Sequence, residues 1–198
     1  MKRIIFILLV IAVAFAVYWF KFRGDDSPEG PKQQPLKVSL HSAAFNSSID
    51  SLLQHYFDLK DAFVDGDSLK ARRSGMALVI YAGNLNLDEL KKDTTGIFES
   101  ASAFVTDIRT NASDMGQSQT IADMRQDFKA VSENVYPLLK TIHYEGKKLY
   151  WQNCPTAFGE DRSANWISET VTVTNPYLGK NNPDYTKCGE IQDTIKAQ

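Results

Sequence analysis

The sequence is poor in cysteine and histidine and carries almost no net charge. Among 198 residues there are two cysteines and three histidines, and the formal net charge is −2. A protein that binds nucleic acid needs a basic excess to neutralise phosphates. The one dense basic run, residues 70–73, is typical of the solvated face of a helix. We therefore expect no nucleic-acid partner.

Motifs of hydrolytic, redox and nucleotide-dependent enzymes are absent as well. No His-Glu-x-x-His, Cys-x-x-Cys, P-loop or Gly-x-Ser-x-Gly occurs. His41 and His55 are separated on one expected helix by about 21 Å, which is too far for them to share a metal ion. A thiol hydrolase would require His143 to reach Cys154, and the residues around Cys154 match no protease signature. We expect a protein that is not an enzyme.

The N-terminus holds a long hydrophobic run. Residues 4–20 are uncharged and overwhelmingly apolar, and basic residues lie on both sides. A helix of this length spans about 25 Å, slightly less than the roughly 30 Å hydrocarbon core of a membrane. Tyr18 and Trp19 suit the membrane interface. We interpret residues 1–22 as a membrane anchor; the alternative is a cleavable signal peptide, since residues 12–14 and 14–16 fit the small-x-small rule.

Residues 23–38 combine glycine, proline, charge and glutamine without apolar periodicity, which predicts a flexible linker. The remaining residues, 39–198, are enough for a single extracytoplasmic domain with its own core. Both interpretations of the N-terminus place this domain outside the cytoplasm. It is either in the periplasm, anchored to the inner membrane by the N-terminal helix, or secreted to the periplasm after signal cleavage.

Apolar residues at spacings of three and four predict a mainly α fold. We expect helices over about 39–64, 68–82, 95–111 and 118–143, and one short turn at 87–90. Short connections favour an antiparallel four-helix up-down bundle. Pro137 should kink or end the fourth helix. In the second helix, we expect these side chains to be buried: Leu69, Met76, Leu78, Val79 and Ile80.

The C-terminal third is aromatic and loop-rich, with minor β structure. Residues 149–151 and 171–174 favour short strands, whereas residues 190–197 favour one more short helix. Asn-Pro pairs at 175–176 and 182–183 are turn signals. Four aromatic residues could line a ligand groove, although such side chains more often form a small core: Tyr150, Trp151, Trp166 and Tyr177.

The two cysteines, Cys154 and Cys188, allow three interpretations. In an exported protein an even number of cysteines is consistent with a disulfide, which would close a loop of about 35 residues and stabilise the fold by roughly 4 kcal/mol. They could instead be ligands of a soft metal, with His143 as a third, or two buried thiols. The residues alone leave the choice open.

Ordered motifs in the second half carry a resemblance to a family. The strings LYWQNCPTAF (149–158), ANWIS (164–168), NPYLG (175–179) and KCGEIQDTI (187–195) follow IADMRQDFKAVSENVYPLLK (121–140). Together they resemble the domain of unknown function 3347 (DUF3347), over about residues 40–196. Members are small extracytoplasmic proteins, and similar domains are attached to adaptor subunits of copper/silver efflux systems.

The resemblance implies a copper site or an efflux-system or other envelope partner. Family members usually carry a methionine two residues after the first cysteine and often another before the second. Two thiolates and two thioethers would suit Cu(I), but this chain has Thr156 and Tyr185 at those positions. We therefore favour a non-enzymatic, membrane-anchored structural or protein-interaction domain without a cofactor, in which Cys154 and Cys188 form a disulfide. The alternative is a copper-type metal-binding or efflux accessory domain that uses both cysteines.

Overall fold

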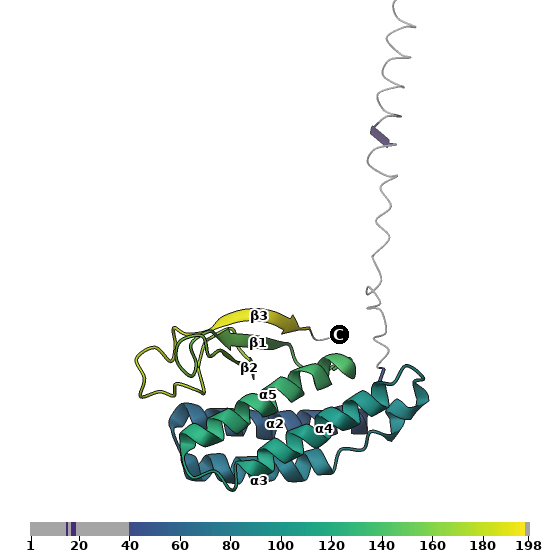
Figure 1. The fold of residues 1–198 in the computed structure, drawn as a ribbon. Coiled ribbons are helices and arrows are strands. Elements are labelled where there is room, and N and C mark those ends of the chain that lie inside the picture. The colour runs from purple at the N-terminus through teal and green to yellow at the C-terminus, as the bar shows by residue number, and fades with distance from the viewer. Residues whose placement is uncertain (1–14, 16, 19–39, 197–198) are drawn as a thin grey trace, which may run out of the picture. The chain divides into compact units, whose positions relative to one another are not determined.

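Four α-helices are followed by a small sheet in the computed structural model, which describes residues 15, 17–18 and 40–196 (Figure 1). Residues Ser39–Gln198 form one compact unit. The predicted anchor (1–22) lies outside the described residues except for residues 15, 17 and 18, and the predicted linker (23–38) lies wholly outside them. In the part that is described, no helix combines the length and the apolar character that crossing a membrane requires.

All four predicted helices are present, and local caps define their ends. They are α2 (Ala43–Asp65), α3 (Ser68–Gly83), α4 (Ile97–Asp114) and α5 (Ile121–Thr141), with a 3-10 turn, η1, at Asp88–Lys92. Ser42 and Asp67 cap the first turns of α2 and α3 through their side-chain oxygens, and Thr120 forms a capping box with Asp123 at α5. Gly66 ends α2 in the left-handed region at φ 74°.

The burial predicted for α3 was confirmed for Leu78 and wrong for three other large side chains. Leu69, Met76 and Ile80 are 56–58% exposed, and the buried face consists of Ala71, Gly75, Leu78 and Ala82. A Cβ on Gly75 would lie 3.4 Å from the Ala112 carbonyl oxygen and 3.5 Å from Met115 Sδ. Small residues therefore allow α3 to approach α4 closely, and this contact decides which face of α3 is turned inward.

Pro137 lies inside α5 and does not end it. The helix ends instead in a Schellman-type turn: the His143 amide donates to the Lys140 carbonyl and the Tyr144 amide to the Leu139 carbonyl. His143 adopts φ 51°, the left-handed conformation in which such turns usually place glycine. The predicted fourth helix therefore stops before His143.

The sheet has the order β2-β1-β3 and is antiparallel throughout. Its strands are β1 (Leu149–Cys154), β2 (Ala164–Ser168) and β3 (Glu190–Ile195). The strand at 149–151 is confirmed, but the strand predicted at 171–174 and the helix predicted at 190–197 were wrong. Residues 190–195 pair with β1, whereas Val171 is 60% exposed and its carbonyl accepts from the Gln152 side chain. Pairing with β1 therefore overrides the local helix preference of residues 190–195.

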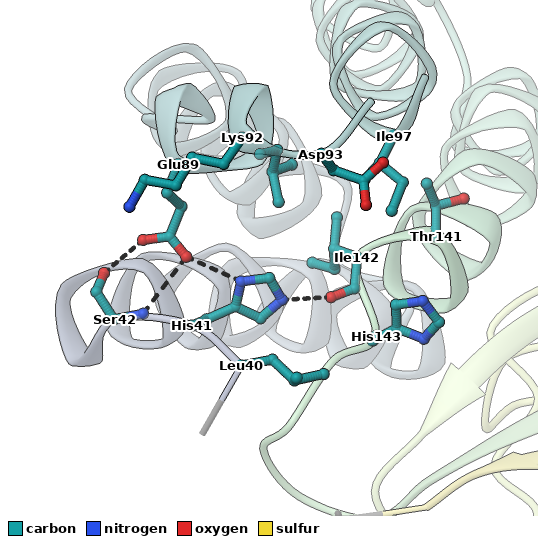
Figure 2. A pocket seen from close by; sticks show the side chains of 11 residues that line it. Leu40, His41, Ser42, Glu89, Lys92, Asp93, Ile97, Thr141, Ile142 and His143 are labelled. Atoms are coloured by element: carbon teal, nitrogen blue, oxygen red, sulfur yellow. Dashed lines mark hydrogen bonds and ion pairs between the residues drawn. The ribbon is translucent and has the colours of Figure 1, made fainter. Parts of the chain in front are cut away.

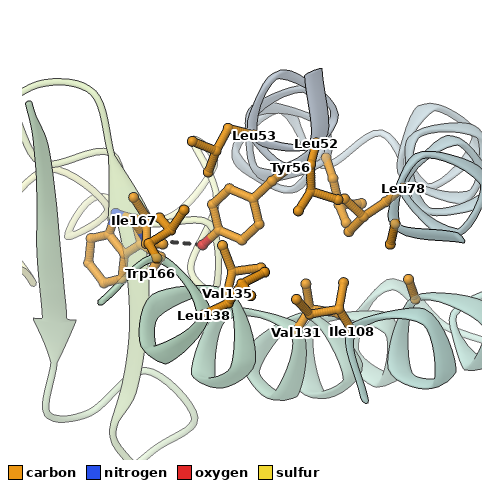
Figure 3. Close-up of a cluster of buried hydrophobic side chains, with 14 of the residues drawn as sticks. Leu52, Leu53, Tyr56, Leu78, Ile108, Val131, Val135, Leu138, Trp166 and Ile167 are labelled. Carbon is orange, nitrogen blue, oxygen red and sulfur yellow. Dashed lines mark hydrogen bonds between the residues drawn. The ribbon is translucent and has the colours of Figure 1, made fainter. Parts of the chain in front are cut away.

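The Tyr56 hydroxyl joins the helices to the sheet (Figure 3). Its oxygen accepts the Ile167 amide of β2 at 3.0 Å and lies 2.8 Å from Ser132 Oγ of α5. Since Ile167 supplies the donor on one side, the hydroxyl hydrogen is available to Ser132. Two residues earlier on β2, the Asn165 carbonyl accepts from the Tyr177 hydroxyl. Tyrosine hydroxyls thus bond two backbone groups of the β2 edge strand that a further strand would otherwise pair.

The NPYLG segment is a turn that docks on the end of α2. The Asn175 side-chain oxygen accepts the amides of Tyr177 and Leu178, and its nitrogen donates to the Cys188 carbonyl. Lys180 then donates its amide to the Val64 carbonyl, at the C-terminal end of α2. The asparagine therefore connects the helical part to the loop that carries Cys188.

Replacing Tyr56 by phenylalanine should destabilise the domain by about 1–3 kcal/mol, because the buried Ile167 amide loses its acceptor. Urea unfolding of the two proteins measures the difference. Tyr81→Phe, at a tyrosine that is 41% exposed, is the matched control and should change the free energy of unfolding little. Equal effects of the two substitutions would contradict the role given to the Tyr56 hydroxyl.

Candidate functional site

The structure joins Cys154 to Cys188 in a disulfide, with the Cα atoms 5.2 Å apart. Cys154 is the last residue of β1 and is fully buried, whereas Cys188 is partly exposed and lies two residues before β3. A turn brings the second cysteine into place, because the Cys188 amide donates to the Asp184 carbonyl. The favoured interpretation of the cysteine pair is confirmed.

Thr156 lies beside both sulfurs. Its Oγ1 atom is 4.0 Å from Cys154 Sγ and 3.6 Å from Cys188 Sγ. Bonded sulfurs carry no hydrogen, so the threonine hydroxyl is the donor in these weak contacts. The position that the family resemblance singled out is therefore adjacent to the disulfide, although its side chain here is a hydroxyl and not a thioether.

The alternative metal set, Cys154, Cys188 and His143, is not brought together. His143 lines a pocket with Ile195, and Ile195 pairs with Leu149 at the start of β1. Cys154 lies at the other end of this six-residue strand. At the usual rise per residue, its Cα atom is roughly 16 Å from that of Leu149. Among the described residues, no group of three or more His, Cys, Asp or Glu side chains is arranged to hold a metal ion.

The four aromatic candidates do not share a groove. Trp166 is fully buried and Tyr177 is 4% exposed, with their rings 6.0 Å apart in an edge arrangement. Trp151 stacks on Tyr136 of α5 at 4.4 Å, and Tyr150 lies under the Lys148 ammonium. Trp166 and Tyr177 are core residues, as the alternative interpretation expected.

A pocket of about 570 Å³ lies where the described domain begins (Figure 2). Residues from η1 and from the end of α5 line it together with His41. The His41 ring contacts Glu89 Oε1 through Nδ1 at 2.8 Å and the Ile142 carbonyl through Nε2 at 2.6 Å. Both partners are acceptors, so both contacts are hydrogen bonds only when both ring nitrogens carry a proton.

Two glutamates hold the backbone of residues 40–42. Glu145 accepts the amides of Leu40 and His41 at 2.7 and 3.1 Å, and Glu89 accepts the Ser42 hydroxyl at 2.6 Å. Burial acts to raise the pKa of Glu89, but hydrogen bonds from Ser42 and His41 outweigh it and lower the pKa below its usual value. We call these contacts of His41, Ser42, Glu89, Ile142 and Glu145 the N-terminal clasp.

The sequence analysis missed the N-terminal clasp. It excluded a metal ion shared by His41 and His55 but gave His41 no other role, because its partners Glu89 and Ile142 lie 48 and 101 positions away. No local pattern marks such a pair. The signal that could be used was weak: a serine cap next to a histidine at the first turn of an expected helix.

A second pocket, of about 540 Å³, lies beside His143 and holds a charged network. Asp193 of β3 accepts from the Tyr136 hydroxyl and from Lys140 Nζ. The Tyr136 hydrogen bond, followed by that of Lys140, lowers the pKa of Asp193 to about 2. Burial, followed by the same hydrogen bond, raises the pKa of Tyr136 to about 12. The network ties α5 to the edge strand β3 and leaves Asp193 ionised.

A family model described as "Protein of unknown function (DUF3347)" matches residues 52–147. The resemblance to this family is thereby confirmed over those residues. The match runs from within α2 through α5 and stops before β1, so it includes neither cysteine. Neither the curated proteins nor the solved structures gave a match.

Removing the disulfide should lower the free energy of unfolding by about 2–4 kcal/mol, because the loop between the cysteines gains freedom in the unfolded chain. Urea unfolding of the Cys154→Ala, Cys188→Ala protein measures the loss, and helical circular dichroism should be retained because α2–α5 precede Cys154. Reductant should reproduce the loss in the parent chain and do nothing to the double variant. An unchanged free energy after reduction would show that the bond is not stabilising.

Tyr136→Phe should raise the pKa of Asp193 from about 2 toward its usual range, because the strongest donor to the carboxylate is removed. Carboxyl NMR titration measures this change. The folded pKa lies below the unfolded value of about 3.9, so Asp193 stabilises the fold above this pH and the contribution disappears as the pH falls toward 2. Lys140→Met is the control and should raise the pKa less; a larger rise there would reverse the assignment.

Proposed function

We propose that this chain is a membrane-anchored, extracytoplasmic structural or protein-interaction domain that catalyses no reaction. The observation that carries the proposal is the Cys154–Cys188 disulfide. Disulfides form and persist in oxidising compartments such as the periplasm and are rare in the cytosol. The hydrophobic run at residues 4–20 supports an anchor in the inner membrane, and an envelope protein is then the partner class.

Polar groups that line the pocket of about 570 Å³ are engaged in hydrogen bonds within the protein, which supports a non-catalytic role. A general base needs a nitrogen or oxygen that can reach a substrate proton, but both ring nitrogens of His41 face protein acceptors. The second carboxylate of the pocket, Asp93, accepts from Thr95. These groups hold η1, the start of α2 and the end of α5 together, which is what a rigid binding domain requires.

The N-terminal clasp supports a domain whose backbone is held in place from its first described residues. Residues 40–42 come directly after the predicted linker, and two glutamates hold their backbone and side chains. In our proposal, the flexible linker is therefore followed by a domain whose backbone is held by hydrogen bonds from the first turn of α2. The four helices alternate up and down in this proposal, since α2 packs on α3, α3 on α4 and α4 on α5.

The copper alternative requires both sulfurs as thiolates, and in this structure they are bonded to each other. No observation on the described residues favours it over the structural role. It applies to the reduced chain only, where Cu(I) competition titration tests it. An affinity that is the same in the Cys154→Ala, Cys188→Ala protein would eliminate the copper alternative.

Topology and thiol state in cells test the main proposal. The full chain is expressed in a Gram-negative host, and protease is added to intact cells and to spheroplasts. We expect the domain to be cleaved in spheroplasts alone, the chain to remain with membranes after a carbonate wash, and maleimide-PEG to react only after reduction. The Cys154→Ala, Cys188→Ala protein is the labelling control. Protection in spheroplasts together with thiols that react without reductant would overturn the extracytoplasmic assignment.

A further inference from the structure

Residues 169–189, which join β2 to β3, form neither helix nor strand and pack against the sheet. We call this segment the strap. Gln152 of β1 donates its side-chain amide to the Thr170 carbonyl at 3.1 Å. A Cβ on Gly189 would lie 3.1 Å from the Trp166 ring of β2. The strap therefore covers side chains of two strands directly.

Lys180 and Cys188 attach the second half of the strap to the helices and to the sheet. Lys180 donates its amide to the Val64 carbonyl at 2.7 Å, and the disulfide joins Cys188 to Cys154. Between these two attachments the backbone hydrogen bonds run within the strap itself, as where the Cys188 amide donates to the Asp184 carbonyl. The disulfide is therefore the covalent bond that ties residues 181–189 to the sheet.

The two sulfurs of this bond differ in their access from solvent. Cys154 is fully buried, whereas Cys188 is partly exposed. Cys188 also lines a pocket of about 390 Å³ together with Asn182 and Asp184, and Cys154 does not line it. A thiolate attacks one sulfur of a disulfide and displaces the other. The pocket therefore gives an external thiolate access to Cys188 Sγ, and Cys154 is the sulfur that is displaced.

Thr156 places a hydrogen-bond donor at the sulfur that leaves. Its hydroxyl oxygen is 4.0 Å from Cys154 Sγ, and its side chain is exposed. When the S–S bond breaks, the departing sulfur becomes an anion, to which a hydroxyl donates a stronger hydrogen bond than to a neutral sulfur. A buried anion without a donor would be costly. Thr156 therefore favours attack from the Cys188 side.

Two buried polar atoms beneath the strap have no hydrogen-bond partner within the described part of the chain. They are Gln152 Oε1 and Trp166 Nε1, and they belong to residues that are paired directly across β1 and β2. A buried polar atom without a partner carries a free-energy cost that contact with water removes. Hydration of these atoms therefore favours separation of the strap from the sheet once the covalent bond is broken.

We propose that Cys188 is a thiol-exchange site through which an external thiol releases the strap. The attacking thiolate forms a mixed disulfide with Cys188 Sγ, and Cys154 keeps the electron pair of the broken bond and takes up the proton that the thiol lost. A second thiolate of the reductant then attacks the reductant sulfur of the mixed disulfide, and Cys188 leaves as a thiol. The reductant ends as a disulfide. The inference goes beyond the proposed structural role, since the bond that holds the strap becomes reversible.

Glutathione identifies the attacked sulfur in the purified full-length chain. After brief exposure without denaturant, acid stops the exchange, an alkylating reagent caps the thiols, and peptide masses are mapped. We expect glutathione on Cys188 and the alkyl group on Cys154; glutathione on Cys154 would overturn the direction of attack. A bond that is reduced only at urea concentrations that unfold the domain overturns the exchange site.

Single-cysteine variants measure the same asymmetry where the mixed disulfide does not accumulate. Glutathione disulfide should modify Cys188 in the Cys154→Ala protein several-fold faster than Cys154 in the Cys188→Ala protein. Equal rates without denaturant would show that both sulfurs are equally accessible, which contradicts the assignment of Cys188 as the point of attack.

The Thr156 hydroxyl has a test of its own. Thr156→Val should slow reduction by dithiothreitol several-fold while the free energy of unfolding stays the same, and Thr156→Ser should restore the rate. Thr106→Val is the matched control, because Thr106 is exposed on α4 and its hydroxyl donates to the Ser102 carbonyl. A parent-like rate in Thr156→Val would remove the hydroxyl from the mechanism.

Hydrogen exchange followed by mass spectrometry tests the release of the strap. At labelling times short enough for the helices to stay protected, reduction should increase exchange several-fold in peptides from residues 181–189. Unchanged exchange there overturns the release, and so does an equal loss of protection in α2–α5, which would show that the whole domain unfolds. The purified chain serves for all these measurements, so their outcome is independent of the topology in cells that tests the proposed function.

Discussion

The hydroxyl of Tyr56 is the contact on which the two parts of the domain depend. It stands at a fully buried point between α2, Ser132 of α5 and the Ile167 amide of β2. A three-stranded sheet has two edges, and a buried edge with unpaired amides costs several kcal/mol. Because a tyrosine from the first helix accepts the β2 amide, the sheet can lie against the helices without a further strand, and burial keeps the pKa of the hydroxyl far above its usual range.

The other end of the sheet depends on covalent and turn contacts. The disulfide ties the last residue of β1 to the loop before β3, and Asn175 bonds the carbonyl of Cys188 while the loop that follows it reaches the end of α2. The disulfide therefore does more than close a chain loop, because it fixes a segment that has little regular structure of its own against two elements that do. Thr156 lies beside both sulfurs because the disulfide brings the loop with Cys188 to the end of β1.

The clasp at residues 40–42 and the exposed face of α3 both depend on contacts between residues far apart in the sequence. The clasp uses hydrogen bonds: one imidazole and two carboxylates hold backbone that would otherwise fray at the start of a helix. On α3, Ala71, Gly75 and Ala82 lie with Leu78 on the interior face, and the other large apolar side chains are left exposed. The clasp fixes the start of the described domain, and close packing of α3 on α4 decides which face of α3 is exposed.

The four helices could be predicted from the sequence, because spacing, caps and Gly66 are local properties of the chain. The first half of strand β1, residues 149–151, was recognised from its aromatic residues for the same reason. The cysteine pair could be favoured as a disulfide but not proved, since the distance between two residues thirty-four positions apart is not a local property. Tertiary structure alone decided that Glu190–Ile195 is a strand, which face of α3 is buried, and that His41 meets Glu89 and Ile142. Each of these outcomes depends on a partner far along the chain, whose pairing or packing outweighs a local preference of a few tenths of a kcal/mol per residue.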